Sequence, residues 1–463
     1  MSIRTVTSDL KAYFNREIDF SSLVFFRIAF GILMITGQIR FLANDWVYEL
    51  YVQPKYFLKY YGFEWISVPD ETGLYILYAL SIVSALFISL GLFYRFSSII
   101  FFAVFTYLEL MDVSNYLNHY YFITVISFLM IFLPLNKAFS LDIKFGLVKE
   151  KGLIQRKYFM LLLICITGLY FMAGLSKLNW EWLFEANPMK IWLPQKVDTP
   201  LIGPLLDEPW MAYLLSWLGA AYDLSVPFLL FFRRTRKLAL FSVFMFHFLT
   251  AVFFPIGMFP YIMMTFSLLF LENDTHKRLL GFIGYKSNGQ KFVTQGFIKH
   301  VYKPLMGFVL FIFFVFPLRS HTYPGDLFWT EQGYRFSWRV MLMEKMGHCY
   351  FYVKDPNQPG QKEVLPSCYL TNNQERHMSR QPDLILQMAN IIEEDYKNQG
   401  IQDPEVRVVS WVNLNGKGSQ LFIDPSIDLT KIEDSWAHKD WIIPLDSVIS
   451  PVDFKHPFLS RTD

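Results

Sequence analysis

The chain has 463 residues, of which 53% are hydrophobic and 19% aromatic, whereas only 18% are charged. Soluble proteins carry about 25% charged residues, so this composition indicates a protein of the lipid bilayer. The formal net charge of +2 argues against nucleic acid as a partner. Residues 1–20 are polar and lack a cleavable signal-peptide pattern, so we expect the first membrane span to act as the insertion signal.

Apolar stretches of about 20 residues predict helices that cross a membrane. The chain has nine such stretches, of which the third and the eighth are short: 21–41, 73–93, 97–112, 117–136, 157–178, 210–232, 238–255, 257–272 and 301–318. Lysine and arginine collect in every second loop, for example in RRTRK at 233–237. The positive-inside rule then predicts a cytoplasmic N-terminal segment (1–20), a polytopic α-helical transmembrane domain (21–318) and an extracytoplasmic C-terminal domain (319–463).

The C-terminal domain shows the sequence patterns of a mostly β fold. Strand-like runs flank the turns DPNQPG (355–360) and NGKG (415–418), and each predicts a hairpin, with a helical pattern between them at 381–400. Cys349 and Cys368 lie nearly symmetrically about the first turn. They either face each other across the ladder as a disulfide or remain free thiols.

Two ionisable residues lie at the ends of apolar stretches. Lys177 ends the fifth stretch and His119 begins the fourth, so two antiparallel helices would place both at the extracytoplasmic end. A charge in hydrocarbon costs about 2.5–3.5 kcal/mol at a helix centre, and such residues are candidate functional sites. The structural alternatives are a Lys177 ammonium that extends to water and a His119 within an aromatic belt. His247, inside the seventh stretch, either lines a pocket or makes a helix–helix hydrogen bond.

Several motifs occur in order along most of the chain. Residues 170–183, YFMAGLSKLNWEWL, contain Lys177, and residues 111–122, MDVSNYLNHYYF, contain His119. The other motifs are GLFYRFSS (91–98), IGMFPYIM (256–263), HTYPGD (321–326) and EQGYRFSWRVML (331–342). In these motifs the chain resembles the vitamin K-dependent γ-glutamyl carboxylase family in its short bacterial form, which belongs to the wider group of horizontally transferred transmembrane-domain (HTTM) proteins.

The resemblance implies a lyase of a bacterial inner membrane that takes reduced vitamin K or menaquinol with O2 and CO2. It would convert the quinol to its epoxide and carboxylate glutamate γ-carbons of a protein or peptide, with no metal. The oxygenated quinol would supply the strong base, so the protein only has to deprotonate the hydroquinone. Burial disfavours a charged lysine, which suits Lys177 as this base. His119 and Asn118 would hydrogen-bond the quinone oxygens, and His247 is a candidate for the same pocket.

The resemblance also implies a glutamate-binding segment in the C-terminal domain. Its best matches here are Trp329, Tyr334, Ser337 and Trp338. Arg335 and Arg339 either bind a substrate carboxylate or are surface charges. Two other functions stay open at this point: a quinol-epoxidising or other quinone-linked membrane oxidoreductase without carboxylation, and a non-enzymatic membrane scaffold or transporter.

Overall fold

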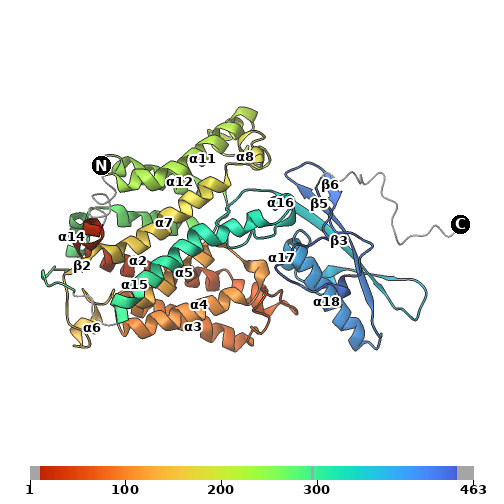
Figure 1. Cartoon of the computed structure of the whole chain (residues 1–463), viewed down its shortest axis with the longest axis horizontal. Helices are drawn as coiled ribbons and strands as arrows, with labels where there is room; N and C mark the ends of the chain where they lie inside the picture. Colours follow the sequence, from red (N-terminus) through yellow and green to blue (C-terminus); the bar gives the residue numbers. More distant parts are fainter. Residues whose placement is uncertain (1–10, 293–296, 446–463) are drawn as a thin grey trace.

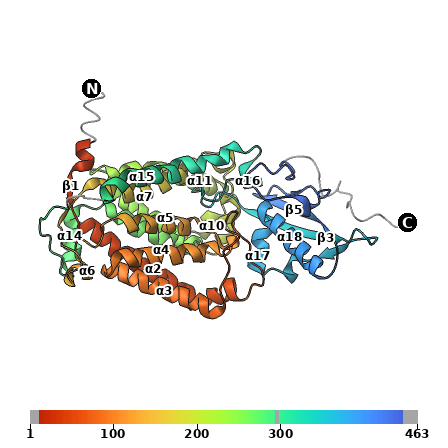
Figure 2. The same cartoon turned by 60° about the horizontal axis from the view of Figure 1, so that its bottom comes forward.

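The computed structural model describes residues 11–292 and 297–445 and consists of a long helical domain with a C-terminal domain at one of its ends (Figures 1 and 2). Each of the nine apolar stretches contains a helix, because each is a run of apolar residues without an interrupting turn signal. These helices are α2 (Ser21–Ala43), α3 (Glu71–Leu90), α4 (Tyr94–Leu110), α5 (Asn118–Phe132), α7 (Arg156–Ser176), α11 (Pro209–Phe231), α12 (Arg236–Phe253), α13 (Phe259–Ser267) and α15 (Phe297–Leu310).

Among the described residues, six helices are long and apolar enough to cross a membrane, so the protein is multi-pass but the predicted count of nine spans is not confirmed. α5 and the run from α13 into η4 (Leu268–Phe270) are apolar but shorter. α4 has 17 residues, about 26 Å at 1.5 Å per residue, which is less than the roughly 30 Å hydrocarbon core. The ninth stretch continues beyond α15 through η5 (Phe311–Val315) and η6 (Phe316–Thr322).

Helix α7 lies at the centre of the helical domain. Of its most apolar stretch, 78% of the residues are buried, against 22% for α12. α7 packs against α11 and α15, and α2, α3, α4 and α5 pack against one another in succession. Polar side chains on α7 are therefore enclosed by protein rather than by lipid.

The end of the helical domain away from the C-terminal domain carries short elements (Figure 1). β1 (Glu17–Asp19) pairs antiparallel with β2 (Leu153–Gln155), near α6 (Leu141–Lys144) and α14 (Asn273–Gly281). The basic loops from which the cytoplasmic side was predicted belong to this end. The orientation in the membrane stays a prediction.

The C-terminal domain is built on a four-stranded antiparallel sheet in the order β4-β3-β5-β6. Both predicted hairpins are confirmed: β3 (Lys345–Lys354) pairs with β4 (Lys362–Val364), and β5 (Glu405–Leu414) with β6 (Ser419–Leu421). The predicted helix is α18 (Pro382–Asn398), whose apolar face packs on the sheet. Because this helix and the shorter α16 (Leu327–Thr330) and α17 (Asn372–Met378) contribute much of the fold, the domain is mixed rather than mostly β.

Cys349 and Cys368 are both free thiols in the structure, so the disulfide alternative is wrong here. β4 ends at Val364, and Cys368 lies beyond it in a short helix, η7 (Pro366–Cys368). Cys349 instead pairs with Ser410 of β5, and its Sγ lies 3.4 Å from the Ser410 hydroxyl. The two cysteines do not face each other because the β3–β4 ladder is too short to reach Cys368.

The two domains meet through hydrogen bonds at what we call the domain-facing end. Asn118 Nδ2 donates to the Arg339 carbonyl oxygen at 2.7 Å, and Trp192 Nε1 donates to Glu344 at 2.6 Å. The remaining short elements of the helical domain are η1 (Tyr48–Val52), η2 (Val113–Asn115), α8 (Trp180–Leu183), α9 (Met189–Trp192), η3 (Pro194–Lys196) and α10 (Gly203–Leu206).

Candidate functional site

Lys177 lies at the end of α7, at the domain-facing end, and its side chain turns inward. The residue is 7% exposed, and its Nζ forms an ion pair and hydrogen bond with Asp223 of α11. The ammonium also lies 5.4 Å from the centre of the Trp182 ring, an attractive cation–π arrangement. The geometry is therefore an enclosed acid–base pair rather than an ammonium extended to water.

Gly174, one turn before Lys177, allows this pair to form. A Cβ atom at this position would lie 2.8 Å from the backbone nitrogen of Leu224, closer than real Cβ contacts occur. The absence of a side chain thus lets α7 and α11 approach closely, as small residues do between membrane helices. This approach brings Asp223 within reach of the Lys177 ammonium.

Sequence reasoning missed Asp223, although a usable signal was present. It is one carboxylate within the apolar stretch 210–232 and is 4% exposed. Ionisable residues inside membrane segments pair with one another or mark a functional path. The same rule that singled out Lys177 applies to Asp223.

His247 of α12 makes a helix–helix hydrogen bond, which is one of the two arrangements considered for it. Its Nε2 lies 2.7 Å from the Tyr170 hydroxyl of α7, which is a helix–helix hydrogen bond. Its Nδ1 is buried and has no partner among the described residues. A buried polar atom without a partner is costly, so this nitrogen is available to a ligand.

His119, near the start of α5, is 6% exposed and packs edge-on against Tyr120. The Phe259 ring packs near both imidazoles, with its centre 6.0 Å from that of His119 and 5.7 Å from that of His247. Within the described part of the chain, no hydrogen bond or ion pair joins His119 to Lys177. The two residues lie at the same end, as predicted, without direct contact of these kinds.

Asn118 serves the contact between the domains. Its Oδ1 accepts from the Tyr116 hydroxyl at 2.9 Å, and its Nδ2 donates to the Arg339 carbonyl at 2.7 Å. An amide retains one further donor and one further acceptor site, but its orientation is set by these two bonds. Asn118 therefore positions the start of α5, and with it His119.

A cavity of about 460 Å³ lies between the helical and C-terminal domains. Its wall combines aromatic rings with charged side chains of both signs. The cations are Arg319, Arg335 and Lys439, and the carboxylates are Glu109, Glu331, Asp383 and Asp434. The residues that line it include Tyr60, Tyr61, Phe63, Thr106, Glu109, Tyr116, Tyr121, Phe316, Arg319, Glu331, Gln332, Gly333, Arg335, Phe336, Asp383, Trp436 and Lys439.

The side chains predicted to bind glutamate lie beside this cavity and do not line it. Trp338 is fully buried against Phe313, at 4.5 Å between ring centres, and Trp329 donates to the Ile443 carbonyl. Ser337 donates to the carbonyl of Tyr334, which packs on Phe328. These four residues build the core, and their sequence neighbours face the cavity.

The segment that faces the cavity has an unusual backbone. Glu331, Phe336, Trp338 and Met341 have φ between 52° and 60°, the left-handed region that side chains rarely adopt. Gly333, also at positive φ, lies so close to Ser320 that a Cβ would come within 2.8 Å of its Cα. Strained backbone of this kind clusters at functional sites and persists only where surrounding contacts enforce it.

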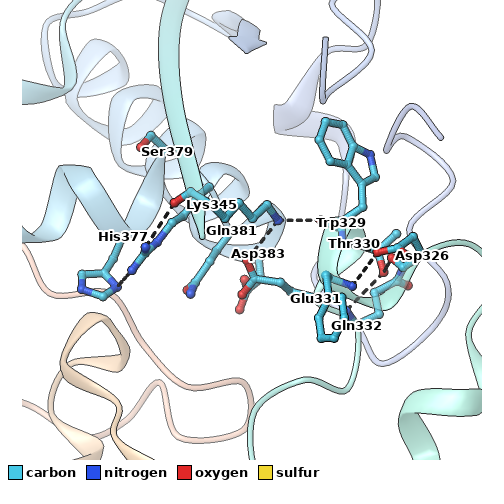
Figure 3. A network of polar contacts seen from close by, with 12 residues as sticks. Asp326, Trp329, Thr330, Glu331, Gln332, Lys345, His377, Ser379, Gln381 and Asp383 are labelled. Atoms are coloured by element: carbon cyan, nitrogen blue, oxygen red, sulfur yellow. Dashed lines mark hydrogen bonds and ion pairs between the residues drawn. The ribbon is translucent and has the colours of Figure 1, made fainter. Parts of the chain in front are cut away.

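A polar network supplies these contacts (Figure 3). Lys345 Nζ donates to the Trp329 carbonyl and forms a 3.0 Å ion pair with Glu331, and both side chains are buried. Burial lowers the pKa of Lys345 although the Glu331 carboxylate opposes this shift. Arg335 pairs with Asp383; burial opposes both charges, but their attraction outweighs it and lowers the pKa of Asp383.

Comparison with known families divides the chain into two matched parts. Residues 15–275 match the family model of the HTTM domain, which covers more than half of the chain. Residues 299–448 match the model described as the lumenal domain of vitamin K-dependent gamma-carboxylase. No solved structure matches the chain. Lys177, Asp223 and His247 lie in the first part, and the strained segment 331–341 lies in the second.

Proposed function

Because the chain belongs to the vitamin K-dependent gamma-carboxylase family, we propose that it carboxylates glutamate side chains of a protein or peptide. Its co-substrates would be reduced vitamin K or menaquinol, O2 and CO2. The quinol, oxygenated by O2, supplies the strong base that a glutamate γ-C–H bond requires. Two observations carry the proposal: the enclosed Lys177–Asp223 pair, and the unpartnered Nδ1 of His247 on α12, the helix that packs against the α11 helix of Asp223.

The residues around the pair fit a quinol. His247 Nδ1 lacks a partner, and a quinol hydroxyl or quinone oxygen would satisfy it. Phe259, which packs near both His247 and His119, offers an apolar wall of the kind that aromatic ligands contact. The Tyr170 hydroxyl holds the His247 ring in place from the opposite nitrogen.

The Lys177–Asp223 pair is suited to accept a proton from the hydroquinone. With one shared proton the pair has no net charge, whichever residue holds the proton. A second proton makes the pair positive beside the quinol anion, and the two charges attract strongly in a site shielded from water. General-base catalysis of this kind contributes roughly 10²–10⁴-fold to a rate.

The large cavity between the domains is the proposed entry for the glutamate side chain. Of the two arginines considered from the sequence, Arg335 is already paired with Asp383. Arg339 has no carboxylate partner among the described residues, but it does not line this cavity. Arg319 lines the cavity and donates to the carbonyls of Phe316 and Arg335, without a carboxylate partner among the described residues. A guanidinium in this state can bind a substrate carboxylate.

The test is epoxide formation by detergent-solubilised protein given reduced vitamin K and O2, with labelled CO2 and a glutamate peptide. We expect epoxide and labelled peptide from wild type, and neither from folded Lys177→Ala. Epoxide without labelled peptide would favour the quinol-epoxidising alternative. One observation favours it: Trp329 and Trp338, two of the residues expected to bind glutamate, are buried in the core. No epoxide from folded protein with several quinols would favour a scaffold or transporter.

A further inference from the structure

Glu109, near the domain-facing end of α4, lines two cavities. One is the cavity of about 460 Å³ between the domains, and the other is a smaller cavity of about 50 Å³ inside the helical domain. Among the described residues that line them, Glu109 is the one that both cavities share. A carboxyl group at this position stands at the junction of an outer and an inner space.

The inner cavity leads towards His119. Tyr120, which lines it, packs edge-on against the His119 ring with 4.6 Å between ring centres. Arg40 also lines it, and Arg40 and His119 both flank Gly257: a Cβ there would lie 3.9 Å from Arg40 Nη1 and 3.8 Å from His119 Nε2. About 50 Å³ is enough for a few water molecules, which can carry protons.

Glu109 has no ion pair or hydrogen bond to any other described residue. Glu109 is partly exposed, whereas the Thr106 hydroxyl, one turn earlier on α4 and also lining the outer cavity, is buried without a partner among the described residues. Buried polar groups are normally satisfied, and an intramembrane carboxyl without a structural partner indicates a functional role. The titratable residues that line the inner cavity with Glu109 are Arg40, Tyr51, Tyr78 and Tyr120. The charged residues that line the outer cavity with it are Arg319, Glu331, Arg335, Asp383, Asp434 and Lys439.

The proposed reaction, on which this inference rests, releases one proton per turnover. O2 takes two electrons from the hydroquinone and two from the ring double bond, so the products are epoxide and water, and both hydroquinone hydrogens end in the water. In the carboxylation, the γ-C–H bond breaks, a C–C bond to CO2 forms, and one proton remains. An enclosed site must pass this proton to the outside before the next turnover.

We propose that Glu109 carries this proton from the inner cavity beside His119 to the outer cavity. Its carboxyl group accepts a proton from water in the inner space and releases it to water in the outer one. Glu109 is thus a proton-relay residue.

The test compares Glu109→Gln, Glu109→Asp and Glu109→Ala with Glu71→Gln, an exposed control. We expect Glu109→Gln to lower kcat roughly 10²-fold with little change in KM. Glu109→Asp should retain part of the rate with a larger solvent deuterium isotope effect, and formate should restore activity to Glu109→Ala. A folded Glu109→Gln with wild-type kcat, or a Glu109→Ala that formate does not rescue, would overturn the relay. If Glu109→Gln does not fold, the deciding variant is Glu109→Asp. A solvent isotope effect in Glu109→Asp that equals that of wild type would also overturn the relay.

A second readout needs no quinol. The infrared carboxyl bands that Glu109→Gln or Glu109→Asp alters are followed after transfer of the protein to D2O. A shift within the mixing time means that water reaches Glu109, as the relay requires, and slow exchange contradicts it. Wild-type protein that makes neither epoxide nor labelled peptide would remove the proposed function, whereas active wild type with unaffected Glu109 variants would remove this inference alone.

Discussion

Gly174 of α7 and Asp223 of α11 are in such close contact that a Cβ atom on Gly174 would lie 3.0 Å from the Asp223 carbonyl carbon. The Lys177 ammonium, one turn further along α7, pairs with the Asp223 carboxylate. The chemistry proposed for Lys177 therefore depends on the spacing between two helices, and a glycine without any reactive group controls that spacing.

We expect Gly174→Ala to separate α7 from α11 and to draw Lys177 away from Asp223. Epoxide formation should fall at least ten-fold, while the protein loses about 1–3 kcal/mol of stability from overpacking. The matched control is Gly307→Ala in α15, where an added Cβ meets nothing within 4 Å. Equal epoxidation rates for the two variants would show that the helix spacing at Gly174 does not matter.

Asp223→Asn should leave the fold intact but weaken the base. Asparagine has nearly the same shape, so the Lys177 hydrogen bond can remain while the carboxylate charge is lost. We expect epoxidation to fall by roughly 10²–10⁴-fold, as for the loss of a general base. Rates are measured beside the thermal midpoint of each protein, and a wild-type rate from Asp223→Asn would limit the acid–base role to Lys177.

The buried Lys345–Glu331 pair should show strong coupling in a double-mutant cycle. Lys345→Met leaves the Glu331 carboxylate buried without its cation, which costs about 3–5 kcal/mol. Adding Glu331→Gln removes that charge, so the double variant should regain much of the loss. Denaturant unfolding measures the four free energies. Additive losses would mean that the two residues act independently.

The Arg335–Asp383 pair should make the stability of the protein decrease at acidic pH. The pKa of Asp383 is below its ordinary value, because attraction to Arg335 outweighs the opposing effect of burial. Its contribution is therefore full above the unfolded-state pKa, about 3.9, and is lost as the pH falls through the folded-state pKa. Asp383→Asn should lower the free energy of unfolding by about 1–3 kcal/mol at neutral pH. The variant should also lose less stability than wild type when the pH is lowered. The thermal midpoints of wild type and Asp383→Asn are measured from about pH 7 to pH 3. If both fall by the same amount over this range, the predicted role of Asp383 is contradicted.

The helices and both hairpins could be predicted because they depend on residues that are close in the chain. Apolar stretches end at turn signals, and DPNQPG and NGKG separate strand-like runs, so β3 to β6 and α18 follow from local patterns. Lys177 and His119 were found in the same way, because the cost of an ionisable group beside hydrocarbon can be read from its immediate neighbours.

Only the tertiary structure decided what these residues meet. Asp223 lies 46 positions from Lys177, and Tyr170 lies 77 positions from His247. Whether they touch depends on helix rotation and separation, which are set by packing at positions such as Gly174. For the same reason Trp338 turned into the core while Arg319 faces the cavity. The sequence by itself determined which segments are helices and which residues are costly to bury; the partners that make them a site came from the packing of distant segments.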